Sequence, residues 1–303
     1  MLIDLLGALP GAVAQGLIWG VMAVGVYITY KILDIADLTV DGSICTGAAV
    51  CTMMMLAGQN PWAAMLCAVL AGVAAGAVTG LLHIKLGIPA ILAGILTQMI
   101  LWSANLKILG KANQALSARS NPVILSQMNI PSALIVLAIV AAVLIALLYW
   151  YFGTEQGSAI RATGANPAMS RAQGININAM KVLGLSLSNG MVALSGGLMA
   201  QYQGFSDINM GRGAIVIGLA AVIIGEVLCD AFFRKGCNFS VRLGFVVLGG
   251  IVYYLVMVLI LWLKLDPNDL KLFTAVIVAA FLAVPYLKGQ AKSSFHRLKK
   301  GGK

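Results

Sequence analysis

Acidic side chains are scarce in this sequence, and one short stretch holds a large share of them. Only 10 of the 303 residues are Asp or Glu, and three of these, Asp34, Asp37 and Asp41, lie within eight residues. The stretch ends in Gly42 and Ser43, where a long apolar run begins. A carboxylate or hydroxyl at the start of a helix can accept hydrogen bonds from the first amides of that helix. We therefore expect Asp41 and Ser43 to cap the helix that follows them.

Glu226 is the only acidic residue deep within a predicted apolar helix. A carboxylate in apolar surroundings needs a charged or hydrogen-bonding partner. We expect Glu226 to pair with a basic loop residue such as Arg234, or else to serve as a gate or proton site. Proton relays through a membrane normally need a chain of acidic or histidine side chains. Because this sequence offers a single candidate, a carrier driven by an ion gradient is disfavoured.

Motifs for covalent chemistry are missing from the sequence. It has no G-x-x-x-x-G-K-[ST] phosphate loop and no HExxH, and its two histidines, His83 and His296, fall in a predicted loop and in the C-terminal tail. The cysteines show neither C-x-x-C spacing nor neighbouring histidines, so we interpret them as small packing residues. They are Cys45, Cys51, Cys67, Cys229 and Cys237. We expect no enzymatic activity, no metal and no cofactor bound by this chain.

The composition requires these side chains to be positioned by membrane helices. Hydrophobic residues make up 60% of the chain and charged residues 10%, too few polar groups to cover a soluble domain. Hydrogen bonding inside lipid then demands helices. We predict an all-α polytopic membrane protein, with residues 1–303 forming a single transmembrane domain in the plasma membrane. The net charge of +10 comes from basic residues at helix ends, so it does not imply nucleic-acid binding.

Nine apolar spans are expected in this sequence, within a range of about eight to ten helices. Two of them, Gly42–Ala57 and Gly213–Leu228, are short and indicate broken or re-entrant helices. Both carry a Gly-x-Ile-x-x-Gly pattern, which favours an inverted repeat, although small residues also recur by chance in membrane helices. The other predicted spans are Gly11–Leu33, Pro61–Leu82, Ile88–Leu106, Pro131–Phe152, Val182–Tyr202, Leu243–Leu263 and Leu272–Leu287.

A polar segment from Gly153 to Lys181 separates two of these spans and is long for a simple connection. We predict a short helix over Ser158–Met169. Gly164 and the Asn166-Pro167 pair should interrupt it, because the residue before a proline is pushed out of the α region. Gly174 should make a second break before the next span.

The sequence GSAIRATGANPAMSRAQGIN within this segment resembles the cytoplasmic coupling segment of ABC-importer permeases of the branched-chain amino-acid and ribose type. In that family, a short helix of this loop sits in a groove of the ATPase subunit. A merely solvated connecting loop is the alternative interpretation. The resemblance implies that the ATPase is contacted by Arg161, Ala162, Thr163, Gly164, Asn166, Pro167, Met169, Arg171 and Gly174.

Two further motifs narrow the resemblance. LTVDGS at residues 38–43 and GLAAVIIGE at Gly218–Glu226 resemble the subgroup of these permeases that is associated with import of tryptophan or tyrosine. Asp41 interrupts the DLSVG-like version that the sugar permeases carry, which argues against ribose. Beside the capping role, the alternative for this stretch is a cytoplasmic gate. The predicted gate and solute path comprise Asp37, Thr39, Asp41, Ser43, Gln98, Asn189 and Glu226.

The resemblance also implies partners and a direction. A second permease copy would complete the path as a homodimer, separate ATPase subunits would bind ATP and Mg²⁺, and an extracytoplasmic binding protein would deliver the solute. With residues 153–181 inside, 14 of the 20 Lys and Arg residues lie in the cytoplasm, including the tail 288–303 at the C-terminus, and the N-terminus lies outside. The rival functions are an ion-driven secondary carrier and a non-transporting membrane assembly subunit.

Overall fold

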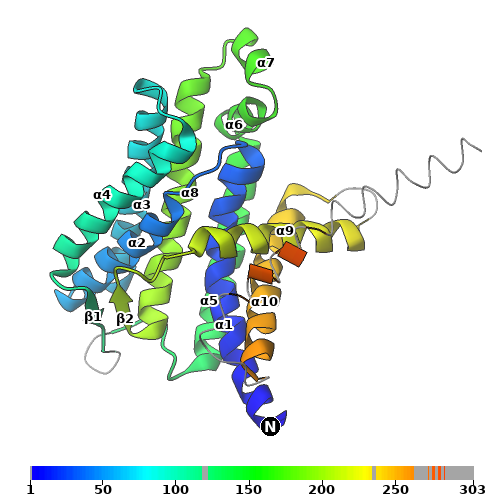
Figure 1. Ribbon diagram of the computed structural model, residues 1–303. Helices are drawn as coiled ribbons and strands as arrows, with labels where there is room; N and C mark the ends of the chain where they lie inside the picture. Colours follow the sequence, from blue (N-terminus) through cyan, green and yellow to red (C-terminus); the bar gives the residue numbers. More distant parts are fainter. Residues whose placement is uncertain are drawn as a thin grey trace, which may run out of the picture.

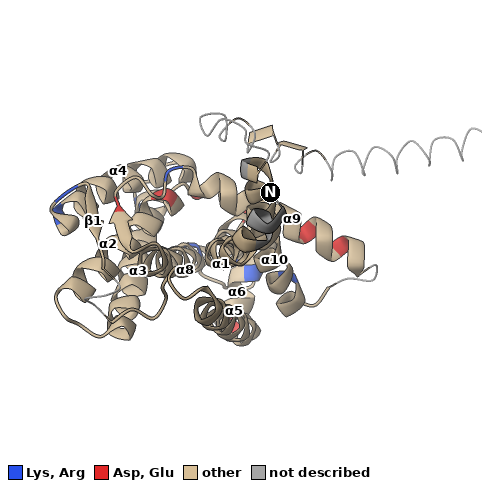
Figure 2. Cartoon of the chain, turned by 90° about the horizontal axis from the view of Figure 1, so that it is seen from below, with Lys and Arg blue, Asp and Glu red and all other residues tan. Residues whose placement is uncertain are grey.

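The computed structural model describes residues 2–117, 122–233 and 237–262, with six isolated residues nearer the C-terminus. Within these ranges the chain is almost entirely helical (Figure 1). Figure 2 looks along the bundle and shows long stretches of helix without a charged residue. The predicted span Leu272–Leu287 and the tail 288–303 lie outside the fully described part of the chain.

Seven helices in the described ranges are long and apolar enough to cross a membrane, as the all-α prediction requires. An eighth apolar helix, α2 (Val40–Leu56), has only 17 residues, which agrees with the short span expected there. Among the spans that the structure fully describes, each predicted boundary lies within a few residues of the observed one, apart from an earlier start of the first span. The other span expected to be short, Gly213–Leu228, is longer than predicted, since α9 has 19 residues. The seven long helices are α1 (Leu2–Tyr27), α3 (Pro61–Lys85), α4 (Ala90–Leu109), α5 (Ile130–Gly153), α8 (Ile177–Gln203), α9 (Ala214–Phe232) and α10 (Phe239–Trp262).

Helix α8 lies in the middle of the bundle, between α1, α2 and α3 (Figure 1). Small residues allow its backbone to approach the neighbouring helices closely. A Cβ atom at Gly47 of α2 would collide with the carbonyl of Ala193, and one at Gly76 of α3 with that of Leu185. These contacts place the polar side chains of α8 directly against α2 and α3.

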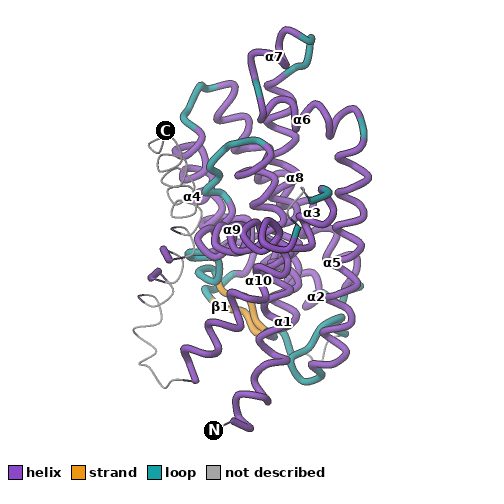
Figure 3. Tube along the Cα trace, turned by 90° about the vertical axis from the view of Figure 1, so that its right-hand side faces the viewer, coloured by secondary structure: helices purple, strands orange, loops and turns teal. Residues whose placement is uncertain are grey.

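The two ends of the bundle differ. The N-terminus and the short strands β1 (Asn113–Ala115) and β2 (Phe205–Asp207) lie towards one end (Figures 1 and 3). The strands are antiparallel, with Asn113 opposite Asp207. The short helices α6 (Glu155–Ala165) and α7 (Pro167–Ala172) project from the other end. This arrangement agrees with the predicted alternation, which put the N-terminus and residues 153–181 on opposite sides.

The first span does not pass directly into the second. A π-helical turn, η1 (Ile28–Ile32), follows α1, and the Leu33 amide donates to the Ile28 carbonyl at 3.0 Å. Residues 34–39 then run without regular structure to the start of α2. Helix α9 lies across the direction of the other long helices (Figure 1). Two interruptions inside the bundle therefore create two helix N-termini away from its ends, those of α2 and α9.

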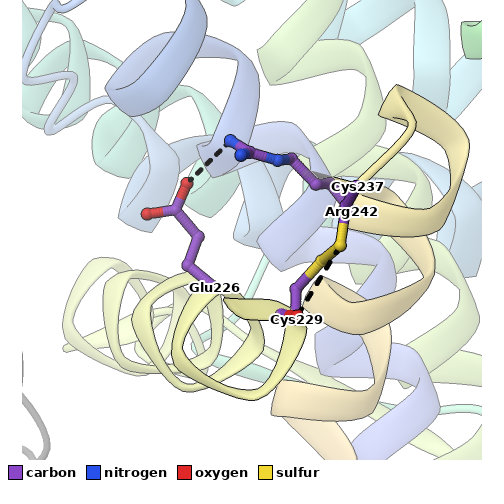
Figure 4. The surroundings of a disulfide bond; sticks show 4 residues. All are labelled: Glu226, Cys229, Cys237 and Arg242. Atoms are coloured by element: carbon purple, nitrogen blue, oxygen red, sulfur yellow. Dashed lines mark hydrogen bonds and ion pairs between the residues drawn. A yellow bond between two sulfur atoms is a disulfide. The ribbon is translucent and has the colours of Figure 1, made fainter. Parts of the chain in front are cut away.

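The cysteines correct one expectation. Cys229 of α9 and Cys237, just before α10, form a disulfide, whereas all five cysteines were interpreted as packing residues (Figure 4). The Cα atoms of the two cysteines lie 6.8 Å apart, and a separation of eight residues in the sequence does not by itself predict this proximity. Cys45 and Cys51 are free and buried, as expected of packing residues.

Candidate functional site

A buried network joins the irregular residues before α2 to α8. The Asp37 carboxylate is 3% exposed and accepts hydrogen bonds from Asn189 Nδ2 at 2.7 Å and from the Thr39 amide at 2.9 Å. Ser43 Oγ donates to Asn189 Oδ1 at 2.6 Å. Asn189 also donates to the carbonyl of Leu185. The Asn189 side chain therefore accepts a hydrogen bond at its oxygen and donates from its nitrogen. None of the hydrogen bonds to the Asp37 carboxylate comes from a cationic side chain.

A chain of hydroxyl groups extends this network to α3 and α4. Thr39 Oγ1 lies 2.7 Å from Thr79 Oγ1, which in turn donates to Thr97 Oγ1 at 2.9 Å. All three threonines are at most 2% exposed. Each of these three threonine hydroxyls has a hydrogen-bond partner, as buried polar groups require. The residues leading into α2 are thus fixed to three neighbouring helices, and four predicted path residues (Asp37, Thr39, Ser43, Asn189) meet in one network.

Asp41 caps a helix, although not the helix expected. Its two carboxylate oxygens accept hydrogen bonds from the amides of Gly213 and Ile215, each at 2.9 Å, at the start of α9. No side chain caps α2 itself, and Ser43 bonds to Asn189 instead. The prediction was wrong in this respect because the turn before α9 folds against the first turn of α2. The N-termini of α2 and α9 consequently meet at one carboxylate.

A cavity of about 240 Å³ lies beside Asp41, between α2, α4 and the turn that precedes α9. Gln98, a predicted path residue, lines it together with Asp41. The cavity is lined by Asp41, Gly42, Cys45, Gln98, Met99, Trp102, Asn105, Ile208 and Arg212. Trp102, Asn105 and Arg212 were not among the predicted path residues. The signal that could have identified Asn105 is its amide within an apolar span.

Glu226 lies apart from that cavity, on α9, and is paired (Figure 4). Its Oε2 lies 3.1 Å from Lys31 Nζ, and its Oε1 lies 4.0 Å from Arg242. Pairing with a basic residue was the expected role, and the described partners come from η1 and α10. Arg234, the partner suggested by sequence, lies outside the described residues. The ion pair links the end of the first span to α9.

Residues 153–181 form two short helices with the predicted break. Asn166 is extended, with φ −154° and ψ 95°, and its side chain caps α7 by accepting from the Met169 amide at 3.0 Å. Gly174 has φ +80°, a conformation that glycine adopts without strain, and it precedes α8 as expected. Gly164, however, does not interrupt α6, which continues to Ala165.

Gly164 has a different role, in packing. A Cβ atom there would collide with the Ile32 carbonyl at the end of η1. The neighbouring residue of the chain, Leu33, packs its side chain against Gly184 of α8. The end of α6 therefore rests directly on the residues that lead to Asp37.

The predicted docking residues divide into inward and outward groups. Thr163 is 1% exposed and bonds within α6, and Ala162 is half-buried. The Arg161 guanidinium donates to the carbonyl of Phe152 at 2.7 Å, which fastens α6 to the end of α5. Met169 is 61% exposed, and Arg171 is exposed beside it on α7. The exposed surface thus lies mainly at α7 and at the Asn166-Pro167 break.

Comparisons with known proteins agree in fold and family. A profile of the family described as branched-chain amino acid transport system / permease component matches residues 9–285. A tyrosine transport system permease protein of Clostridioides difficile is 40% identical over 284 residues, covering 94% of this chain and 93% of that protein. An uncharacterised protein of Rickettsia prowazekii is 34% identical over 269 residues, covering 88% and 94%. PsaBC from Streptococcus pneumoniae, solved in complex with a Fab, shares the fold with a TM-score of 0.54 at 14% identity, covering 94% and 95%.

Proposed function

Because the chain belongs to the family of branched-chain amino acid transport system permease components, we propose that it is the membrane subunit of an ATP-driven importer of an aromatic amino acid. The tyrosine transport permease that is 40% identical over nearly the whole chain supports this substrate class. The sequence has no phosphate loop of its own, so the proposal places ATP and Mg²⁺ on a partner ATPase.

The observation that carries the proposal is the α6–α7 segment at one end of the bundle (Figure 1). It is ordered by its own caps and projects an exposed methionine and arginine, Met169 and Arg171. An apolar and a cationic side chain on a short helix suit a groove in a partner protein. In this proposal α7 contacts the ATPase, while α6 transmits its movement inward.

The transmission follows the packing of Gly164. Closure of the ATPase pair would push α6 against Ile32, and the η1 turn would carry the shift to residues 33–39 and to the Lys31–Glu226 pair. These residues lead to the start of α2, where Asp41 holds the start of α9. Helices α2 and α9 would then move together, which is a means of opening the path alternately to each side.

The remaining partners follow from the same proposal. A second copy of this permease completes the path, and the cytoplasmic face is the end that carries α6 and α7. The external binding protein then meets the opposite end, where β1 and β2 lie (Figure 3). The C-terminus is cytoplasmic in this arrangement, and the protein lies in the plasma membrane among its lipids.

The test is uptake of labelled tyrosine and tryptophan by proteoliposomes that hold the permease, its ATPase and its binding protein. We expect ATP-dependent uptake in the wild type and a loss of at least about tenfold in Arg171→Glu, since charge reversal at a docking contact opposes the partner. Lys85→Glu, an exposed charge reversal at the end of α3, is the matched control and should leave uptake within about twofold. Uptake driven by an ion gradient without the ATPase would contradict the proposal.

A further inference from the structure

Asn105 presents an unused amide to the cavity beside Asp41. The residue is 1% exposed, and neither its Oδ1 nor its Nδ2 has a hydrogen-bond partner among the described residues. Buried amides without partners are rare in folded proteins because they lose their hydrogen bonds to water. The buried hydroxyls of Thr79 and Thr97, by contrast, are both bonded. The Asn105 amide therefore has its full hydrogen-bonding capacity left for a ligand in the cavity.

The same cavity carries two opposite charges that do not pair with each other. The Asp41 carboxylate accepts two amide hydrogen bonds, yet a carboxylate can accept about four. No ion pair joins Arg212 to another described residue. An α-amino acid carries an ammonium group and a carboxylate on adjacent atoms. The pair Asp41 and Arg212 is complementary to such a zwitterion.

The cavity also has an apolar side that suits an aromatic ring. Trp102 and Met99 of α4 line it, and they are 43% and 65% exposed. Aromatic and thioether side chains make favourable contacts with an aromatic ring. A phenolic hydroxyl both donates and accepts a hydrogen bond, as the amide of Asn105 does.

We propose that this cavity is a contact site for the transported solute, a zwitterionic aromatic amino acid whose ring hydroxyl bonds to Asn105. The inference rests on the proposed transport function and names a place for the solute within the permease. Asp41 and Arg212 bind the charged end, and Trp102 and Met99 bind the ring. Because Asp41 also holds the start of α9, the occupied cavity is connected to the helix that moves.

The first variant is Asn105→Leu in the complete reconstituted transporter, assayed with tyrosine and phenylalanine. Leucine nearly matches the shape of asparagine and removes an amide that has no protein partner. We expect tyrosine uptake to fall about tenfold relative to phenylalanine uptake, because only tyrosine loses a hydrogen bond. The melting temperature should stay the same or rise. An unchanged uptake ratio, or a loss of stability with parallel loss of both uptakes, would overturn the site.

The second variant is Arg212→Gln, with Lys107→Gln in the last turn of α4 as the matched control, since Lys107 is exposed and does not line the cavity. Arg212→Gln should lower uptake of both amino acids about tenfold while ATPase activity stimulated by the binding protein stays within about twofold. A zwitterionic phospholipid headgroup carries similar charges, so the assay is repeated in liposomes that lack such lipids. A loss that disappears there would assign the cavity to lipid and overturn the proposal.

If the wild-type transporter accumulates no amino acid, the proposed function is contradicted. A direct binding measurement then tests whether the cavity is a solute site. Labelled tyrosine is equilibrated with the complete transporter in lipid nanodiscs, with wild type and Asn105→Leu side by side. Binding to the wild type that is weakened at least fivefold in the variant supports the site. Absence of binding to the wild type, or equal binding to both, overturns it.

Discussion

Two polar regions flank the start of α2, and they differ in how completely their hydrogen bonds are made. On one side, Asp37, Ser43 and Asn189 form a buried network in which each side chain has protein partners. On the other, the cavity holds Arg212 without an ion pair to a described residue, and an Asn105 side-chain amide without a hydrogen bond among the described residues. Each region contains an asparagine within an apolar span, Asn189 of α8 in one and Asn105 of α4 in the other. The sequence therefore identifies polar side chains within apolar spans. Whether those side chains already have hydrogen-bond partners in the protein distinguishes a structural network from a candidate solute site.

The largest difference in stability between the two regions is expected when the same Asn→Leu substitution is made in each. Asn189→Leu leaves Asp37 and Ser43 without their shared partner, so we expect it to lower the free energy of unfolding by at least about 3 kcal/mol. Asn105→Leu removes no protein hydrogen bond and should change it by less than about 1 kcal/mol. Unfolding of the purified permease by SDS titration measures both. Equal losses of stability in the two variants would remove the distinction between the regions.

A second substitution tests whether α6 controls both regions. Gly164→Ala places a Cβ atom against the Ile32 carbonyl and should cost about 1–3 kcal/mol of stability through overpacking. We also expect ATP-dependent uptake to fall about tenfold. The added Cβ atom would force α6 away from η1, and the contact that transmits the movement would be lost. Gly153→Ala meets no atom within 4 Å and is the matched control. Normal uptake by Gly164→Ala would mean that this contact does not carry the movement.

The junction between the two regions should give a smaller effect. Asp41→Ala removes the cap of α9 and should lower the free energy of unfolding by about 1–2 kcal/mol. Asp34→Asn is the control, since Asp34 is exposed at φ +56° and asparagine tolerates that conformation. Circular dichroism of the melting transition compares the variants. Asp41→Ala with wild-type stability would show that the carboxylate does not hold α9.

The ion pair away from both regions should give the smallest effect. Glu226→Gln removes the pairs with Lys31 and Arg242, whose side chains are 46% and 36% exposed. Ion pairs with that exposure contribute under about 1 kcal/mol, and salt screens them. We expect a small loss of thermal stability that disappears at high ionic strength. A loss as large as that of Asn189→Leu would indicate that Glu226 is buried in the working assembly.

The sequence by itself determined the membrane class, the helical spans and the break in the 153–181 segment, because these depend on local properties. Apolar run length predicts spans, and a proline restricts the residue before it. It also indicated Glu226 as a paired acid. Sequence could not supply the pairing of Cys229 with Cys237, since it depends on how the end of α9 is placed relative to the residue just before α10.

The positions of side chains from distant segments were decided only by the tertiary structure. Asp41 was expected to cap its own helix but caps α9, which begins 173 residues later in the chain. From the sequence, Asn189 is only a polar residue within one span. The structure shows that it bonds to both Asp37 and Ser43. Hydrogen-bond partners across long separations depend on how helices pack, and a residue's type does not specify that packing. The type sets what a side chain can bind, and the fold decides whether a partner is already present.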